Sequence, residues 1–294
     1  MVFSPQSRDG PHLLFTALSV RVLDLEPVTV GSFPTELSRL RYLALSTVEE
    51  SIPSSIANLR NLETLVVKGL GSELSLPHSL WKMVEMRHLH LKDRASFDLL
   101  NLKLFLEDPS LLEKLETFST PSFSSAEIAE RHLTKLESLK VFCFHCPERS
   151  PCKFNFPSDL KMLTLSGFKL PWSEISAISE LRKLEILKLQ CDAFCGEEWE
   201  VIDEQFSQIK VLKLENLSFE LWSISEDAFS NLEQLVLHSC DCLVEFPSEF
   251  GYISGLKSVE VKLCQESVVN SARNVEEIQV EEMQKNGFKL SISK

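Results

Sequence analysis

Two groups of residues in this chain could do chemistry, and the first is a cluster of thiols beside an imidazole. Cys143, His145 and Cys146 lie within one short stretch, and Cys152 follows them. Such a cluster could bind zinc, and a thiol beside an imidazole could act as a nucleophile. No second cysteine pair stands at zinc-ligand spacing, and no Asn or Asp is obviously placed to orient the ring. We therefore expect structural thiols, with no metal, no cofactor and no enzymatic activity.

The second group is a pair of histidines. His88 and His90 are two residues apart, so in a strand both side chains would lie on the same face and could reach one ligand. Two imidazoles fall short of the three or four ligands that a zinc site needs. The pair is therefore interpreted as surface histidines.

These residues lie within a unit that recurs along the chain. The unit reads apolar-x-x-apolar-x-apolar, and it occurs twelve times at intervals of 19 to 29 residues, with a mean near 23. A period of this length indicates a leucine-rich-repeat solenoid. The units begin at Val20, Leu40, Leu62, Met86, Leu115, Leu136, Leu160, Leu184, Ile209, Leu232, Leu256 and Val275.

Each unit predicts one short strand and a return segment. In the third unit Leu62, Leu65 and Val67 would point inward, with the period-two alternation of a strand. Return segments such as Ile52-Pro53-x-x-Ile56 start with a proline that favours a turn and a short 3₁₀ piece. We expect an α/β fold, a curved leucine-rich-repeat horseshoe. Its concave parallel sheet would have about twelve short strands, and its convex segments would be short helical, 3₁₀ or irregular.

The domain limits follow from the same pattern. Residues 1–17 are expected to be a partial repeat or cap, 18–280 the repeat domain, and 281–294 a capping tail that ends in a strand. The repeat register between residues 95 and 135 stays open, with an extra loop at 99–107 and a helical stretch at 124–132. Cys240 and Cys264, three residues after the last apolar position of their units, are expected to pack under the turn after the strand.

The second position of every unit is charged, which supports the chosen register because charged side chains are almost never fully buried unless paired. We expect a solvated rim with ion pairs between neighbouring units. These positions are Arg21, Arg41, Glu63, Arg87, Glu116, Glu137, Lys161, Glu185, Lys210, Glu233, Lys257 and Glu276.

The net charge and the lengths of the apolar runs limit the classes of partner and the location that we expect for the protein. The formal net charge is −13, with 43 acidic and 30 basic residues, which argues against nucleic acid as a main partner. The chain has no secretion signal and no long apolar run, so we expect neither membrane insertion nor export, and we place the protein in the cytoplasm.

At this point the chain resembles a known family. The stretches Phe33–Leu43, Ile52–Leu59, Gly196–Glu200 and Leu235–Cys240 resemble the repeat region of plant intracellular nucleotide-binding leucine-rich-repeat immune receptors. The resemblance is to the coiled-coil class, similar to late-blight resistance proteins of the nightshade family, and it covers roughly residues 18–294. No phosphate-binding G-x-x-x-x-G-K-[ST] motif is present, so ATP binding is not carried over. The chain is expected to be a truncated product or a fragment of a longer one.

The resemblance implies a non-catalytic recognition domain whose partner is a pathogen effector, a guarded host protein or the receptor's own nucleotide-binding domain. Lysines in the middle of the array could steer an acidic partner, or could simply be common on an exposed strand face. Trp172, Trp199 and Trp222 would be binding anchors if exposed. On the concave face we expect the third and fifth positions of each unit and the residue after the unit to be exposed. The candidate binding residues there are Tyr42, His88, His90, Lys92, Lys140, Lys188, Lys213, Val236 and His238.

Three other functions stay open at this point. Leucine-rich repeats also serve as substrate-binding adaptors of ubiquitin ligases, although the residues before Leu18 are too few for a docking motif. A stand-alone repeat scaffold or a decoy is a further possibility. The outer domain of a receptor kinase would carry a secretion signal and Asn where this chain has Val48, Leu70 or Cys240.

Overall fold

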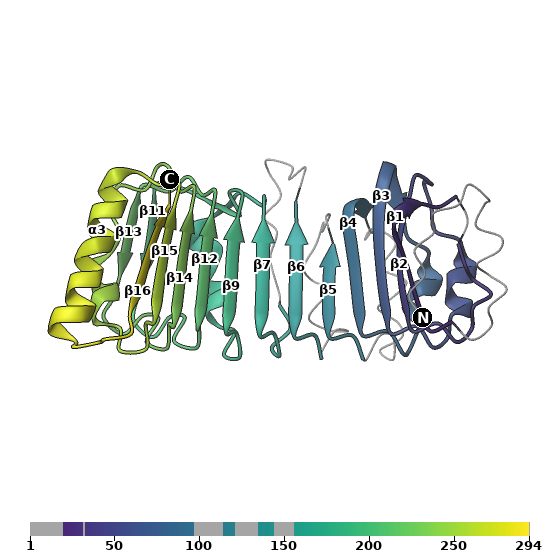
Figure 1. The fold of residues 1–294 in the computed structure, drawn as a ribbon, viewed down its shortest axis with the longest axis horizontal. Coiled ribbons are helices and arrows are strands. Elements are labelled where there is room, and N and C mark those ends of the chain that lie inside the picture. Colours follow the sequence, from purple (N-terminus) through teal and green to yellow (C-terminus); the bar gives the residue numbers. More distant parts are fainter. Residues whose placement is uncertain (1–19, 32, 97–113, 121–134, 144–155, 294) are drawn as a thin grey trace. The chain divides into compact units, whose positions relative to one another are not determined.

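The structure is a computed structural model that describes residues 20–31, 33–96, 114–120, 135–143 and 156–293. It divides into two compact units. Unit 1 comprises Met1–Phe142 and Arg149–Pro157, and unit 2 comprises Cys143–Glu148 and Ser158–Lys294. Both units are built from successive coils that each contribute one strand to a parallel sheet, as Figure 1 shows.

In unit 1 the strands lie in sequence order and pair in parallel throughout. The register matches equivalent repeat positions, so that Leu43, Leu65 and Leu89 face one another across neighbouring strands. The strands are β1 (Val22–Thr29), β2 (Tyr42–Thr47), β3 (Thr64–Ser75), β4 (His88–Ser96), β5 (Thr117–Thr120) and β6 (Ser138–Phe142).

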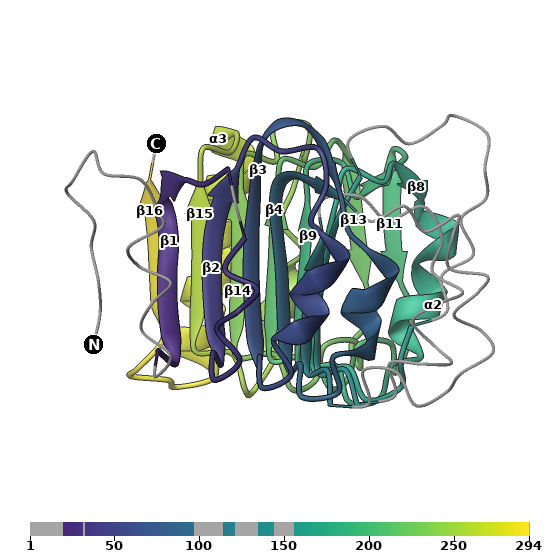
Figure 2. The ribbon, with the colours of Figure 1, turned by 90° about the vertical axis from the view of Figure 1, so that its right-hand side faces the viewer.

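In unit 2 the main sheet also follows sequence order and is parallel, and two short strand pairs lie beside it. Figure 2 places β8, β11 and α2 to one side of β9, as a second layer. The main strands are β7 (Met162–Ser166), β9 (Ile186–Gln190), β12 (Val211–Glu215), β14 (Gln234–His238), β15 (Ser258–Lys262) and β16 (Lys289–Ser293). The second-layer elements are β8 (Leu170–Pro171), β10 (Phe194–Cys195), β11 (Glu198–Val201), β13 (Leu221–Ile224) and α2 (Ser176–Ser179).

The predicted apolar spine is confirmed in both units. The spine consists of the leucines at the fourth position of the repeat unit. These leucines point into the core and are fully buried. Burial of a side chain of this size stabilises the fold by about 1.5–3 kcal/mol. The residues are Leu43, Leu65 and Leu89 in unit 1, and Leu163, Leu187, Leu212 and Leu235 in unit 2.

The proline-led return segments form 3₁₀ turns, as predicted. Pro53, Pro77 and Pro171 each precede such a turn in extended conformation, and Pro247 precedes a fourth. Proline fits there because its fixed φ suits the turn and no hydrogen bond is lost by its missing N–H. The turns are η2 (Ser54–Asn58), η3 (His78–Lys82), η5 (Trp172–Ile175) and η6 (Ser248–Tyr252).

The charged second position forms the expected rim. Arg41 pairs with Glu63 at 3.1 Å and Lys257 with Glu233 at 2.6 Å, and further pairs join Arg87 to Glu116 and Lys210 to Glu185. All of these side chains are well exposed, so each pair contributes at most about 1 kcal/mol. The prediction of neighbouring ion pairs is confirmed.

The chain leaves every main strand of unit 2 except β16 through a residue in the left-handed region. The φ angles are 77° at Gly167, 48° at Cys191, 51° at Asn216, 52° at Ser239 and 50° at Leu263. The backbone N–H of each of these residues donates to a carbonyl oxygen at the end of the next strand, over 2.8 to 3.2 Å. This left-handed row turns the chain away from the sheet once per coil.

The twelfth predicted unit, which was placed at Val275, is wrong. Residues Glu266–Glu277 form the helix α3, and Ile278–Glu282 continue it as the π-helical turn η7. The segment also has a helical stripe, because Val268, Val269, Ala272 and Val275 are all buried. The twelfth strand is β16, where the closing strand of the tail was predicted.

Gln279, which was expected on the exposed strand face, is fully buried instead. Its Nε2 donates to the carbonyl oxygens of Gly251 at 2.7 Å and of Ile253 at 3.0 Å. These bonds fix the end of α3 and η7 over the last coils.

The domain limits 1–17, 18–280 and 281–294 stay predictions. The extra loop at 99–107 and the helix at 124–132 lie outside the described residues, but Leu115 and Phe118 of the intervening unit are buried as the repeat requires.

Candidate binding face

The candidate binding surface is the open face of each unit's strands. It carries the third and fifth positions of every repeat unit and the residue that follows the unit. Most of these side chains are half-buried or exposed. Ala44, Val66 and Thr164 are buried there, contrary to the expected exposure. Strands about 4.8 Å apart let longer neighbours cover a small side chain.

In unit 1 an ion pair reaches across two strands of the open face. Lys92 on β4 lies 2.7 Å from Glu26 on β1, and β2 and β3 run between them. Tyr42 on β2 belongs to the same cluster, because burial, Asp24 and Glu26 raise the pKa of its phenol and Lys92 lowers it. The lysine predicted to attract a partner is therefore already paired with a carboxylate.

His88 and His90 both lie on the open face of β4, as predicted. His90 faces Ser119 on β5, and Ser119 faces Lys140 on β6. Partial burial lowers the pKa of His90, and the charges of His88, Lys92 and Lys140 lower it further. The ring of His90 is therefore neutral at pH 7. The Nζ of Lys140 lies 4.8 Å from the ring centroid of Phe142.

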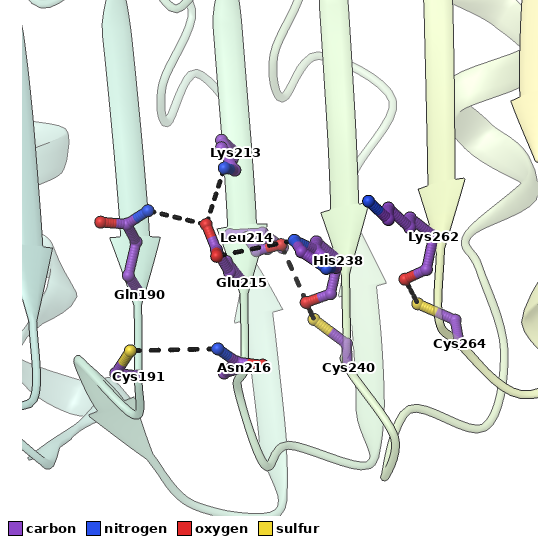
Figure 3. Close-up of polar contacts among 10 residues, drawn as sticks. All are labelled: Gln190, Cys191, Lys213, Leu214, Glu215, Asn216, His238, Cys240, Lys262 and Cys264. Carbon is purple, nitrogen blue, oxygen red and sulfur yellow. Dashed lines mark hydrogen bonds and ion pairs between the residues drawn. The ribbon is translucent and has the colours of Figure 1, made fainter. Parts of the chain in front are cut away.

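In unit 2 three side chains of the open face converge on the carboxylate of Glu215, as Figure 3 shows. Lys213 Nζ lies 2.6 Å from Glu215 Oε2, and Gln190 Nε2 donates to the same oxygen at 2.8 Å. His238 Nδ1 lies 3.5 Å from Glu215 Oε1. The bond from Lys213 holds the pKa of Glu215 below its usual value, although burial opposes this shift.

The lysines in the middle of the array therefore differ in their ion pairs. Lys213 is neutralised by Glu215, and Lys188 is its register partner on β9. Lys188 makes no ion pair within the described part of the chain and is half-buried. Val236, the remaining candidate of this row, is half-buried on β14 opposite Lys213. Lys140 belongs to unit 1, where it lies in the row of His90 and Ser119 described above.

The prediction missed the two carboxylates that organise the open face. Glu26 and Glu215 both occupy the position directly after the repeat unit, on strands β1 and β12. That position was recognised as exposed, but the candidate residues were chosen mainly from the fifth position. A scan of the following position for residues opposite in charge to the lysines would have found both.

Beneath the open face of unit 2 the predicted cysteine row is confirmed in part. Cys240 is fully buried, and its Sγ donates to the carbonyl oxygen of Leu214 at 3.8 Å. Burial raises the pKa of this thiol to about 12. Cys264 is only half-buried, and its Sγ donates to Lys262 O, as Figure 3 shows. Neither thiol is activated for nucleophilic chemistry.

The tryptophans are not binding anchors. Trp172, Trp199 and Trp222 are buried and stack in parallel, with centroid separations of 4.5 Å and then 5.2 Å. They form an aromatic ladder that runs from η5 through β11 to β13. Their indole N–H groups are buried and, among the described residues, find no hydrogen-bond acceptor. The ladder therefore serves packing.

The structure describes one residue of the Cys143–Cys152 cluster, and it bears on metal sites and membrane-spanning helices only within the described residues. Cys143 is described and half-buried, whereas His145, Cys146 and Cys152 lie outside the described residues. Within the described ranges no three His, Cys, Asp or Glu side chains are grouped to hold a metal ion. None of the described helices is long and apolar enough to span a membrane.

Comparison with known proteins agrees with this architecture. The family model described as a leucine-rich repeat region matches residues 1–155. The late blight resistance protein homolog R1B-16 of Solanum demissum is 43% identical over an alignment of 310 positions, which covers 95% of this chain and 24% of that protein. The homologs R1B-12 and R1B-13 of the same species are 43% and 41% identical, over 98% and 97% of this chain. The chain thus spans about a quarter of the length of these relatives.

Solved structures give more distant matches. An internalin (inlF) from Listeria monocytogenes is 16% identical with a TM-score of 0.45, over 95% of this chain and 75% of that one. The leucine-rich repeat domain of the type III effector XCV3220 (XopL) has a TM-score of 0.42, over 96% and 80%. With its repeated coils, its buried leucine spine and its match to the family model, the chain belongs to the leucine-rich repeat region family, and it is homologous to late blight resistance protein homologs of Solanum demissum.

Proposed function

We propose that this chain is the non-catalytic recognition region of a plant disease-resistance receptor and that it acts inside the cell. Its open face would bind a pathogen effector or a guarded host protein. In the resting receptor it would also contact the nucleotide-binding domain and hold that domain inactive. The observation that carries this proposal is 43% identity over 95% of the chain to a late blight resistance protein homolog.

Two features of the chain support a role in protein recognition. A solenoid offers a long, regular surface, which suits contact with a folded partner better than a small catalytic pocket does. The open face presents charged and aromatic side chains at fixed spacings, and some of these are held in place by Glu26 and Glu215. A fixed side chain loses less conformational entropy on binding than a mobile one.

The test is co-expression of the chain with the nucleotide-binding domain of a plant immune receptor of the class proposed above, scored for association and for cell death. We expect association and a lower cell-death response than with the nucleotide-binding domain alone. Lys140→Glu and Lys188→Glu on the open face should reduce association. Lys257→Glu on the rim should leave it unchanged. Equal association of the chain and an unrelated leucine-rich repeat region would overturn the proposal.

A further inference from the structure

On three neighbouring strands of unit 1 the open face offers hydrogen-bond donors and no carboxylate at its third and fifth positions. We call this set the donor patch. Its members pair in register across β4, β5 and β6, so they form two parallel rows. The donor patch consists of His88, His90, Thr117, Ser119, Ser138 and Lys140.

The electrostatic surroundings of the patch are positive. The charged neighbours that act on His90 are His88 and Lys92 on its own strand and Lys140 on β6, and all three lower its pKa. The strand on the other side, β3, offers Val66 and Lys68, and Lys68 is paired with Asp93 at 3.3 Å. Glu26 is held by Lys92 at 2.7 Å. These positive charges favour a negatively charged partner group at His90.

The spacing of the patch indicates how many anionic groups it can hold. His90 and Lys140 are two strands apart, which is roughly 10 Å at the usual strand separation. A partner that carries two anionic groups at roughly this separation can therefore place one at each residue. A peptide in the extended polyproline II conformation advances about 3.1 Å per residue and repeats its side-chain direction every three residues, so two acidic side chains three residues apart lie on one face and match the span.

We propose that the donor patch binds an extended acidic segment of a partner protein, with one carboxylate at His88 and His90 and a second at Lys140, three residues away. The inference rests on the proposed function as a protein-recognition region, and it adds the chemistry of the partner. A carboxylate beside His90 favours the imidazolium form, so binding takes up a proton. The affinity therefore rises as the pH falls from 7.5 to 6, a range in which glutamates stay ionised.

The test uses the purified chain and a labelled ten-residue peptide with two glutamates three positions apart in a serine-rich context. Binding is followed by fluorescence anisotropy at pH 7.5 and 6.0, and the His90 ring by NMR. We expect tighter binding at pH 6.0 and an upward shift of the His90 pKa on saturation. Lys140→Gln should weaken binding roughly two- to fivefold at both pH values. His90→Gln should reduce the pH dependence.

Control variants and peptides distinguish binding at the donor patch from general attraction between charges and from binding of a free anion. Lys257→Gln removes a lysine of the rim that lies outside the patch, and it should leave peptide binding unchanged. A peptide with glutamines in place of the glutamates should not bind, and one with adjacent glutamates should bind more weakly. Equal binding of these peptides would overturn the inference, as would inorganic phosphate that shifts the His90 pKa when the diglutamate peptide does not. Failure with the peptide while the nucleotide-binding domain still associates would leave the proposed function standing.

Discussion

Lys92 Nζ on β4 lies 2.7 Å from Glu26 Oε1 on β1, so one ion pair spans the open face over β2 and β3. The two residues are 66 positions apart in the chain, and only the stacking of three successive coils brings them together. Tyr42 on β2 experiences both charges, with opposite signs. This makes its phenol a probe of the pair.

We expect Glu26→Gln to lower the pKa of Tyr42, because the carboxylate helps to raise it, and Lys92→Gln to raise that pKa further. The chain has two tyrosines, so a Tyr252→Phe background leaves Tyr42 as the only phenol. Absorbance at the phenolate band, with circular dichroism to check that the fold persists, gives the titration. Shifts of the same sign in both variants would contradict the predicted arrangement.

Leu263 in the left-handed row predicts a stabilising substitution. Its φ is 50°, a conformation that costs an L-residue with a large side chain about 1 kcal/mol, and its side chain is largely exposed. Leu263→Asn should therefore raise the free energy of unfolding by up to about 1 kcal/mol, since Asn tolerates this region better. Urea unfolding measures this change in free energy.

Gly167→Ala should lower the free energy of unfolding strongly, because the added Cβ would clash with the carbonyl oxygen of Cys143. Urea unfolding of this variant is the measurement.

The aromatic ladder predicts a large loss on truncation. Trp199 is fully buried between Trp172 and Trp222, so Trp199→Ala leaves a cavity and should cost about 3–5 kcal/mol of unfolding free energy. Trp199→Phe should cost clearly less, because it keeps an aromatic ring and removes a buried N–H without an acceptor. Denaturant unfolding of the three proteins tests the order. Equal losses for Phe and Ala would show that the stack contributes little.

Thiol labelling should follow burial and thiolate formation. Burial raises the pKa of Cys240 to about 12, so at pH 8 almost none of it is thiolate, whereas Cys191 and Cys242 are exposed. Iodoacetamide under native conditions, with peptide mapping by mass spectrometry, should modify Cys191 and Cys242 well before Cys240. Similar rates at all three sites in the folded protein would contradict the buried row, and labelling in denaturant provides the reference.

Acidification should destabilise unit 1 through His90. Its pKa in the folded chain lies below the ordinary value of 6.5, so the unfolded chain binds the proton more readily. The contribution to stability is complete above pH 6.5 and is lost as the pH falls from there through the lowered pKa. His90→Gln should flatten this part of the stability profile, measured as urea midpoints between pH 7.5 and 5. An unchanged profile would show that His90 titrates alike in both states.

Most of the architecture follows from residue spacing. On β12 the buried Leu212 and Leu214 alternate with half-buried residues, and the recurrence of such apolar spacing along the chain predicts which face of each strand is buried. The proline before η2 similarly predicts a turn, because it removes a donor and fixes φ. The helix at Val275 was missed because apolar residues three positions apart suit both the repeat unit and a helix. The buried stripe from Val268 to Val275 favours the helix.

The sequence by itself determined the coil, its inward-facing leucines and its charged rim, because these depend on periods of two residues along a strand and about 23 along the chain. Only the tertiary structure decided which charges of the open face neutralise one another. Glu26 reaches Lys92, and Glu215 gathers Lys213, Gln190 and His238, because stacked coils bring distant residues within a few ångströms. Long charged side chains adopt conformations set by neighbours in space, and spacing along the chain does not specify those neighbours.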